Sequence, residues 1–257
     1  MKVPFLDLKI KNSLKKNNLL KRFKSVLSSG KIIEGKEVAE FEKKIARYIK
    51  KRYVIGLGSG SSALYLALRS LNVKKGDEVI TTPFTWIITI NAILEVGAKP
   101  IFADIRNDFN IDPNSIEKVI TKKTKVIIPM HVGGHMCEMD KISKIAKKHK
   151  IHIVEDAAQS ICSSYKGKKS GAFSEIAAFS LNPMKMLSAY GECGFVSTNN
   201  KKLHTKILSL RHAGTKKDPK KININWSDDY SLNHKIDTIQ ASFVLENLKY
   251  LNKKLQE

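Results

Sequence analysis

The chain alternates between two patterns of apolar residues. Short runs rich in apolar and β-branched residues predict strands, and the segments between them place apolar residues at helical spacing. Such alternation predicts an α/β fold, with a mainly parallel sheet and helices on both of its faces. The expected strands are residues 53–57, 78–82, 99–104, 126–129, 151–155 and 176–181, and the expected helices are residues 58–71 (after a short turn), 86–96, 114–120 and 139–149.

The last amphipathic pattern runs from His234 to Leu251 and predicts a long helix. The chain stops just after this pattern, and we expect that a further segment would normally follow. The apolar face of the expected helix consists of Ile236, Ile239, Phe243, Val244 and Leu248.

Two side chains suited to catalysis follow the ends of expected strands. Asp156 comes directly after residues 151–155, and Lys185 follows residues 176–181 after an Asn-Pro-Met turn. Because open α/β sheets bind ligands at the carboxyl ends of their strands, we expect both side chains to face one crevice. Pyridoxal phosphate requires an amine that holds its aldehyde and a carboxylate that keeps its pyridine nitrogen protonated. The alternatives are a solvated surface lysine and an aspartate that caps a helix.

Two more features lie after expected strands. The turn Gly56–Ser62 (GLGSGSS) opens a helix, so its free backbone N–H groups predict a phosphate cradle. It fits neither the Walker pattern nor the dinucleotide fingerprint, and a plain capping turn is the alternative. Trp86 follows the next strand, where its ring is expected to stack on a planar cofactor unless it belongs to the core.

The composition restricts the possible partners. The chain has 46 Lys+Arg against 24 Asp+Glu, a net charge of +22 that would suit a polyanion. The lysines come as scattered pairs and not as one patch interleaved with aromatic residues, which argues against nucleic-acid binding. The three cysteines, Cys137, Cys162 and Cys193, lack the spacing of a zinc site or a disulfide framework, so no metal is expected.

Targeting segments are not expected either. Charges interrupt the short apolar runs of the N-terminus, which therefore does not resemble a signal peptide. No stretch approaches the roughly 18 apolar residues of a membrane span. We therefore expect a cytoplasmic protein without a membrane partner.

These elements, in this order, resemble the DegT/DnrJ/EryC1/StrS family of sugar aminotransferases, which depend on pyridoxal phosphate. The similarity runs from VPFLDLK at the N-terminus through residues 30–41 (GKIIEGKEVAEF) to IDTIQAS, and so covers nearly the whole chain. It implies the large domain of the type I aminotransferase fold, with a seven-stranded sheet. Because family members continue into a small C-terminal domain, residues 1–235 would form the cofactor-binding domain. Residues 236–257 would begin a helix that leads to the domain lacking here.

The resemblance also implies roles for individual residues. Two positions depart from the family motifs, because Asn182 and Lys235 stand where family members usually carry histidine and arginine. By their place in the motifs, the implied cofactor-binding residues are Gly60, Ser61 and Ser180 at the phosphate, Trp86 over the ring, Asp156 at the pyridinium, Gln159 near the ring hydroxyl, Lys185 at the Schiff base, and Asn233 at the phosphate of the partner subunit in a homodimer.

The implied function is transamination of a keto-sugar, nucleotide-linked, with glutamate as amino donor, in polysaccharide or amino-sugar biosynthesis. Lys185 would be the catalytic acid and base. Three alternatives remain open. A sugar dehydratase of the same family would carry histidine in place of Lys185. A catalytically incomplete or regulatory fragment would bind the cofactor only. A nucleic-acid binder would lose affinity steeply with salt.

Overall fold

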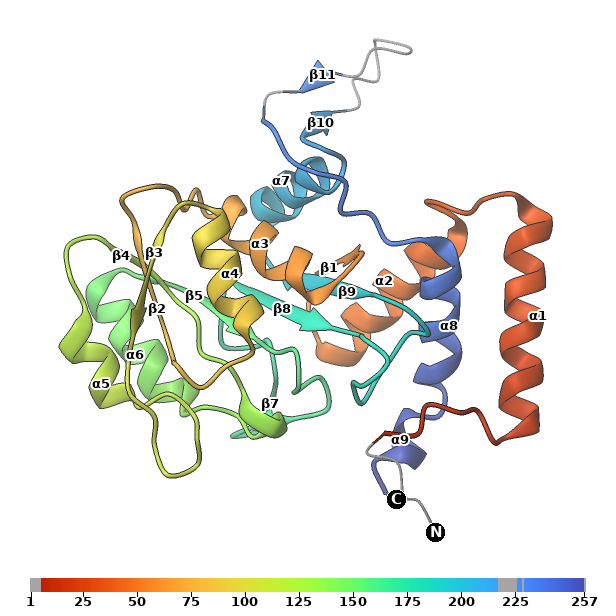
Figure 1. Cartoon of the computed structure of the whole chain (residues 1–257), viewed down its shortest axis with the longest axis horizontal. Coiled ribbons are helices and arrows are strands. Elements are labelled where there is room, and N and C mark those ends of the chain that lie inside the picture. Colours follow the sequence, from red (N-terminus) through yellow and green to blue (C-terminus); the bar gives the residue numbers. More distant parts are fainter. Residues whose placement is uncertain (1–5, 217–225, 228, 257) are drawn as a thin grey trace.

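The computed structural model describes residues 6–216, 226–227 and 229–256, and its centre is a seven-stranded sheet flanked by helices (Figure 1). The strand order is β1-β9-β8-β5-β4-β2-β3, in which β9 runs antiparallel to both neighbours and the other adjacent pairs are parallel. The strands of this sheet are β1 (Tyr53–Leu57), β2 (Glu78–Thr81), β3 (Lys99–Phe102), β4 (Thr124–Ile127), β5 (His152–Asp156), β8 (Ile176–Ser180) and β9 (Gly194–Thr198).

Helices pack on both faces of the sheet (Figure 1). Two short ribbons, β6 (Ser164–Tyr165) with β7 (Lys168–Lys169) and β10 (Thr215–Lys216) with β11 (Trp226–Ser227), lie outside it. The helices are α1 (Ser13–Ser29), α2 (Lys36–Ile49), α3 (Gly60–Ser70), α4 (Ile87–Glu95), α5 (Pro113–Val119), the 3₁₀ turn η1 (Val132–Gly134), α6 (Met139–His149), α7 (Lys201–Arg211), α8 (Thr238–Leu248) and α9 (Leu251–Lys254).

The core follows from the alternation of side chains along the strands, since successive residues point to opposite faces. On one face, side chains such as Ile55 and Ala178 pack against α3, α4 and α7. On the other face, Val54 and Ala177 pack against α2 and α8, while Ile127 packs with α5 and α6. Each large apolar side chain buried in this way contributes about 1.5–3 kcal/mol to the free energy of unfolding. Helices thus cover both faces of the central strands, while the edge strand β3 stays partly exposed.

The first helix, α1, lies outside α8 and is tied to it by a buried carboxylate (Figure 1). Glu246 of α8 accepts hydrogen bonds from Arg22 Nε at 2.9 Å, Asn18 Nδ2 at 3.1 Å and Lys249 Nζ at 2.7 Å. Burial alone would raise the pKa of Glu246, but the bonds from Lys249 and Arg22 outweigh burial and hold the pKa below its ordinary value. The N-terminal and C-terminal helices are therefore joined at this carboxylate.

The predicted α/β fold is confirmed. All six expected strands and four expected helices are present, with boundary shifts of a few residues. The prediction did not include β9 or the helices α1, α2 and α7. Within the part of the chain that the structure describes, no helix is both long enough and apolar enough to cross a membrane.

The expected start of the last helix is wrong. Residues 234–236 are extended, and Lys235 forms a bridge with Leu57 at the end of β1. The helix begins at Thr238, because the Asp237 side chain caps it by accepting the Gln240 N–H at 2.7 Å. Ile236 is buried outside the helix, and Phe243 is only partly buried. The helix α8 packs against α1 and α2.

Candidate active site

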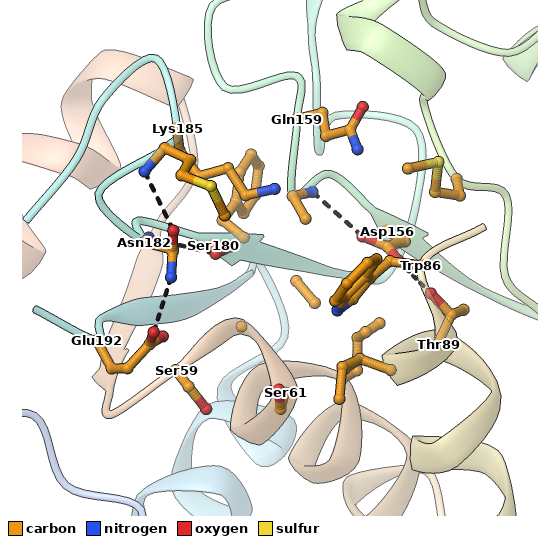
Figure 2. Close-up of a pocket in the computed structure, with 18 residues that line it drawn as sticks. Ser59, Ser61, Trp86, Thr89, Asp156, Gln159, Ser180, Asn182, Lys185 and Glu192 are labelled. Atoms are coloured by element: carbon orange, nitrogen blue, oxygen red, sulfur yellow. Dashed lines mark hydrogen bonds between the residues drawn. The ribbon is translucent and has the colours of Figure 1, made fainter. Parts of the chain in front are cut away.

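The carboxyl ends of β1, β2, β5 and β8 meet at one edge of the sheet, and a cavity of about 550 Å³ lies there. This volume is within the usual range for a small-molecule site. Figure 2 shows the side chains that converge on the cavity. Its lining includes Ser59, Gly60, Ser61, Trp86, Thr89, Met130, Asp156, Gln159, Phe179, Ser180, Asn182, Met184, Lys185 and Glu192.

Asp156 lies at the end of β5 and is buried. Its carboxylate accepts hydrogen bonds from Thr89 Oγ1 at 2.8 Å and from the Ala158 N–H at 3.2 Å. Burial raises the pKa of Asp156, although both hydrogen bonds oppose the rise. Among the described residues, no cationic group forms an ion pair with this carboxylate. The wall of the cavity therefore presents a buried anion that a ligand cation, such as a protonated pyridine, would neutralise.

The neighbouring Glu155 points away from the cavity into a closed network. Its carboxylate accepts hydrogen bonds from the Gly171 N–H at 2.8 Å and from Ser174 Oγ at 2.7 Å, and it lies 3.2 Å from His131 Nε2. Burial alone would raise the pKa of Glu155, but the bonds from His131 and Ser174 outweigh burial and lower it. Glu155 therefore fixes the end of β5 and is fully satisfied within the protein.

Of the predicted phosphate turn, Gly56–Ser62, the residues Ser59, Gly60 and Ser61 line the cavity, and Figure 2 shows Ser59 and Ser61. Ser59 caps α3 by accepting the Ser62 N–H at 3.1 Å, and the N–H groups of Gly60 and Ser61 belong to the first turn, where a helix supplies no carbonyl partners. A Cβ on Gly60 would lie 2.8 Å from Ser180 Cβ, so glycine allows the turn to approach β8. Amides and hydroxyls thus gather at a helix N-terminus, as an anion requires.

Lys185 lies in the irregular loop that follows β8, and its side chain lines the same cavity as Asp156. The loop turns at once after the strand, because Asn182 accepts the Lys185 N–H through its backbone oxygen at 2.8 Å. The amine and the carboxylate expected from the sequence are thus brought to one cavity (Figure 2).

Two further lining residues lie on loops at the rim. Trp86 precedes α4 and is 71% exposed, so it is not a core residue. Its indole lines the same cavity as Asp156, so it can contact a planar ligand bound there (Figure 2). Gln159 accepts the Gly133 N–H at 2.7 Å through its side-chain oxygen, which leaves its NH₂ group able to donate to a ligand.

Asn233 is the one expected site residue that lies outside the cavity lining. It is exposed, and its backbone forms a bridge with His212. The other seven expected residues, Gly60, Ser61, Trp86, Asp156, Gln159, Ser180 and Lys185, all line the cavity. The Asn233 side-chain oxygen accepts the Lys235 N–H at 3.3 Å, which leaves its NH₂ group at the surface.

The sequence interpretation missed two polar residues of the cavity. Thr89 lies in α4, three residues after Trp86, and no pattern distinguished it from the other polar residues of that helix, Asn91 and Glu95. Glu192 lies between Gly191 and the next strand, and no pattern distinguished it from a surface carboxylate. In the described part of the chain, no cluster of His, Cys, Asp and Glu side chains could hold a metal ion.

Comparison with known proteins gives the family. The model of the DegT/DnrJ/EryC1/StrS aminotransferase family matches residues 13–257, so this chain belongs to that family. By its family and fold, the chain belongs to the class of enzymes that use pyridoxal phosphate, as the resemblance implied.

Individual relatives are similar over almost the whole chain. A pleiotropic regulatory protein of Geobacillus stearothermophilus is 39% identical, covering 98% of this chain and 67% of the relative. A UDP-2-acetamido-2-deoxy-3-oxo-D-glucuronate aminotransferase of Pseudomonas aeruginosa is 35% identical, covering 98% of this chain and 69% of the relative. A dTDP-3-amino-3,4,6-trideoxy-alpha-D-glucose transaminase of Streptomyces venezuelae is also 35% identical, and this chain spans 65% of its length.

Solved structures agree with the sequence relatives. The crystal structure of DesV from S. venezuelae has a TM-score of 0.92 at 35% identity, covering 98% of this chain and 66% of that one. NtdA from Bacillus subtilis, with bound cofactor PMP, has a TM-score of 0.90 at 34% identity, covering 98% of this chain and 57% of that one. This chain therefore spans somewhat more than half to about two thirds of these relatives.

Proposed function

We propose that this chain catalyses transamination of a keto-sugar with pyridoxal phosphate as cofactor and glutamate as amino donor. One observation carries the proposal: Lys185, the buried Asp156 and the phosphate turn at Gly60 and Ser61 line a single cavity. An isolated lysine or aspartate has many structural uses, but the three together meet the chemical needs of this cofactor. A protein of this family that had lost catalysis would not need all of them.

The residues fit the cofactor in distinct ways. The amides and hydroxyls of Gly60, Ser61 and Ser180 would hold the phosphate. Burial raises the pKa of Asp156, and a protonated pyridine nitrogen beside its carboxylate would lower that pKa. Asp156 would keep the pyridine nitrogen protonated. Bound pyridoxal phosphate supplies an electron sink for the carbon that loses a proton. Lys185 would anchor the aldehyde and, once the amino donor displaces it, move a proton at the α-carbon of the donor.

Trp86 and Gln159 would orient the cofactor ring. The exposed indole of Trp86 offers a stacking face, and the free NH₂ group of Gln159 offers a donor to the ring hydroxyl. Both contacts act on a flat heteroaromatic ring, and neither requires the substrate.

The acceptor would be a nucleotide-linked keto-sugar, used in polysaccharide or amino-sugar biosynthesis. Support comes from the relatives, two of which are named as aminotransferases of UDP- and dTDP-linked sugars. The net charge of +22 suits an anionic diphosphate. We place the reaction in the cytoplasm, where the three free cysteines would stay reduced.

The active form would be a homodimer in which Asn233 reaches the cofactor phosphate of the partner subunit. The exposure of Asn233 and its position outside its own cavity support this assignment. Large apolar side chains are also exposed at the rim and before Asn233, including Phe84, Trp86, Tyr230 and Leu232. We retain residues 1–235 as the cofactor-binding domain, with residues 236–257 leading toward a second domain.

The decisive measurement is the absorbance spectrum of the purified chain with pyridoxal phosphate, before and after glutamate is added. A band that depends on covalent attachment should form, and glutamate should convert it to the amine form of the cofactor. Lys185→Ala should lose both the band and the conversion. Absence of any Lys185-dependent band would contradict the proposed enzyme.

A regulatory or catalytically incomplete protein is the second candidate, because one relative is named as a pleiotropic regulatory protein. It predicts that the Lys185-dependent band forms but that glutamate leaves it unchanged. A sugar dehydratase is disfavoured by Lys185, since that branch carries histidine there. A nucleic-acid binder predicts a steep loss of affinity for DNA or RNA with added salt.

A further inference from the structure

The segment that carries Lys185 has little to hold it in place. Residues 182–193, here called the lysine loop, connect β8 to β9 without helix or strand. The neighbours of Lys185, Met184 and Met186, are 63% and 42% exposed, so apolar packing does not fix this part of the loop. An amine that must meet one atom of a ligand nevertheless needs a defined position.

The second half of the lysine loop is held by α8. Asn247 Nδ2 donates to the Ser188 oxygen at 2.6 Å, and Gln240 Oε1 accepts the Tyr190 N–H at 3.0 Å. Leu187 and Ala189 are also buried between these contacts. Nearer to Lys185, α9 contributes one bond, from Lys254 Nζ to the Met186 oxygen at 3.0 Å. The first half of the loop therefore depends mainly on its own hydrogen bonds.

Asn182 takes part in most of the hydrogen bonds within the first half of the lysine loop. Its side-chain oxygen accepts the Met184 N–H at 3.1 Å, and its backbone oxygen accepts the Lys185 N–H at 2.8 Å. Its Nδ2 donates to Glu192 Oε1 at 2.7 Å, across the base of the loop (Figure 2). The Asn182 side chain thus holds the Met184 N–H and bonds this turn to Glu192 at the far end of the loop. Backbone bonds from the Leu181 N–H to the Cys193 oxygen at 2.8 Å and from the Ala189 N–H to the Leu181 oxygen at 2.7 Å close the base of the loop but do not reach the turn before Lys185.

We propose that the Asn182–Glu192 pair positions Lys185, by holding the backbone turn from which its amine reaches the cofactor aldehyde. The proposal rests on the proposed function, because it takes Lys185 as the anchor. In that reaction the Lys185 nitrogen bonds to the aldehyde carbon, and the aldehyde oxygen leaves as water. Without the pair, the amine samples more positions and meets the aldehyde less often.

The chain contains a matched control at the other end of the same two strands. Asn200 follows β9, accepts the Lys202 N–H at 2.9 Å, and donates through Nδ2 to Glu175 Oε1 at 3.1 Å. Glu175 directly precedes β8, and β8 pairs with β9 in antiparallel register. Asn200 therefore makes the same kinds of bonds as Asn182 but lies far from Lys185.

Two measurements on the whole chain separate positioning from folding. The first is the rate at which borohydride fixes pyridoxal phosphate on Lys185. The second is the affinity for pyridoxamine phosphate, which has no aldehyde and cannot link to the lysine. Asn182→Ala should slow fixation about tenfold and leave the pyridoxamine phosphate affinity unchanged. Asn200→Ala should change neither quantity.

Exchanging the donor and the acceptor tests the Asn182–Glu192 hydrogen bond directly. Asn182→Asp keeps an acceptor for the Met184 N–H but sets a second carboxylate against Glu192, and it should also slow fixation. Adding Glu192→Gln supplies a donor from the other side and should restore the rate. Fixation at the unmodified rate in Asn182→Ala, or a parallel loss of pyridoxamine phosphate affinity, would overturn the proposal. If the unmodified chain forms no Lys185-dependent link, the proposed function fails and this proposal with it.

Discussion

At the scale of single residues, the two adjacent carboxylates at the end of β5 have opposite environments. Glu155 is surrounded by donors and its pKa is lowered, whereas Asp156 lines the cavity and its pKa is raised by burial. Strand alternation sends one side chain to each face of the sheet, so neighbouring acids come to differ in this way. The protein stabilises one charge internally and leaves the other for a ligand.

Because the pKa of Asp156 is raised in the folded chain, the free energy of unfolding should depend on pH. Between the ordinary value of 3.8 and the folded-state pKa, the folded chain binds more protons than the unfolded chain, so the free energy of unfolding falls as pH rises through this window. Asp156→Asn should remove that fall and raise the free energy of unfolding of the cofactor-free chain at neutral pH. Urea unfolding across a pH series measures both effects. An unchanged pH dependence in the variant would show that Asp156 carries no such cost.

At the scale of elements, the phosphate turn depends on close contact between α3 and the strands beside it. A Cβ on Gly194, the first residue of β9, would lie 2.5 Å from the Ser59 carbonyl and 2.6 Å from the Gly60 nitrogen. Gly194→Ala should therefore displace the turn, cost about 1–3 kcal/mol of stability and weaken pyridoxal phosphate binding. Fluorescence titration with the cofactor measures the binding, beside urea unfolding.

A nearby glycine provides the comparison for that variant. In Gly58→Ala the new Cβ would lie 3.3 Å from the Lys235 oxygen, a tight contact that a shift of a few tenths of an ångström relieves, so the displacement should be smaller than in Gly194→Ala. If Gly194→Ala bound the cofactor as well as Gly58→Ala, the turn would not depend on this contact.

The sequence predicted the elements that position the site because their patterns are local. Residues 53–57 and 139–149 were predicted with their observed boundaries, and the βα order placed Asp156 and Lys185 at one edge. The strand β9 was not predicted, and its antiparallel direction is set by pairing with β1 and β8 in the folded sheet, which a local pattern does not show. The Asn182–Glu192 bond was equally invisible, because it joins residues that only the folded loop brings together.

The end of the chain shows the same limit. Periodicity extended the last helix back to His234, but the Leu57–Lys235 bridge and the Asp237 cap set its start at Thr238. A buried apolar residue such as Ile236 gives the same signal in an extended segment as in a helix.

At the scale of the whole molecule, the proposed site is shared between subunits. Each cavity would contain Lys185 of one chain and the phosphate contact Asn233 of the other. This arrangement distinguishes a homodimer with composite sites from a monomer, in which both residues would have to act within one chain.

Mixing two defective variants tests the shared site. Lys185→Ala removes the anchor, and Asn233→Ala removes the contact offered to the partner, so each variant alone should fix little pyridoxal phosphate with borohydride. In a hybrid dimer one site carries both defects, while the other combines an intact Lys185 with an intact Asn233. Random exchange of equal amounts makes half of the dimers hybrid, so fixation should recover to about a quarter of the unmodified level. Fixation that stays at the mean of the two separate variants after subunit exchange would show that Asn233 does not act across the interface.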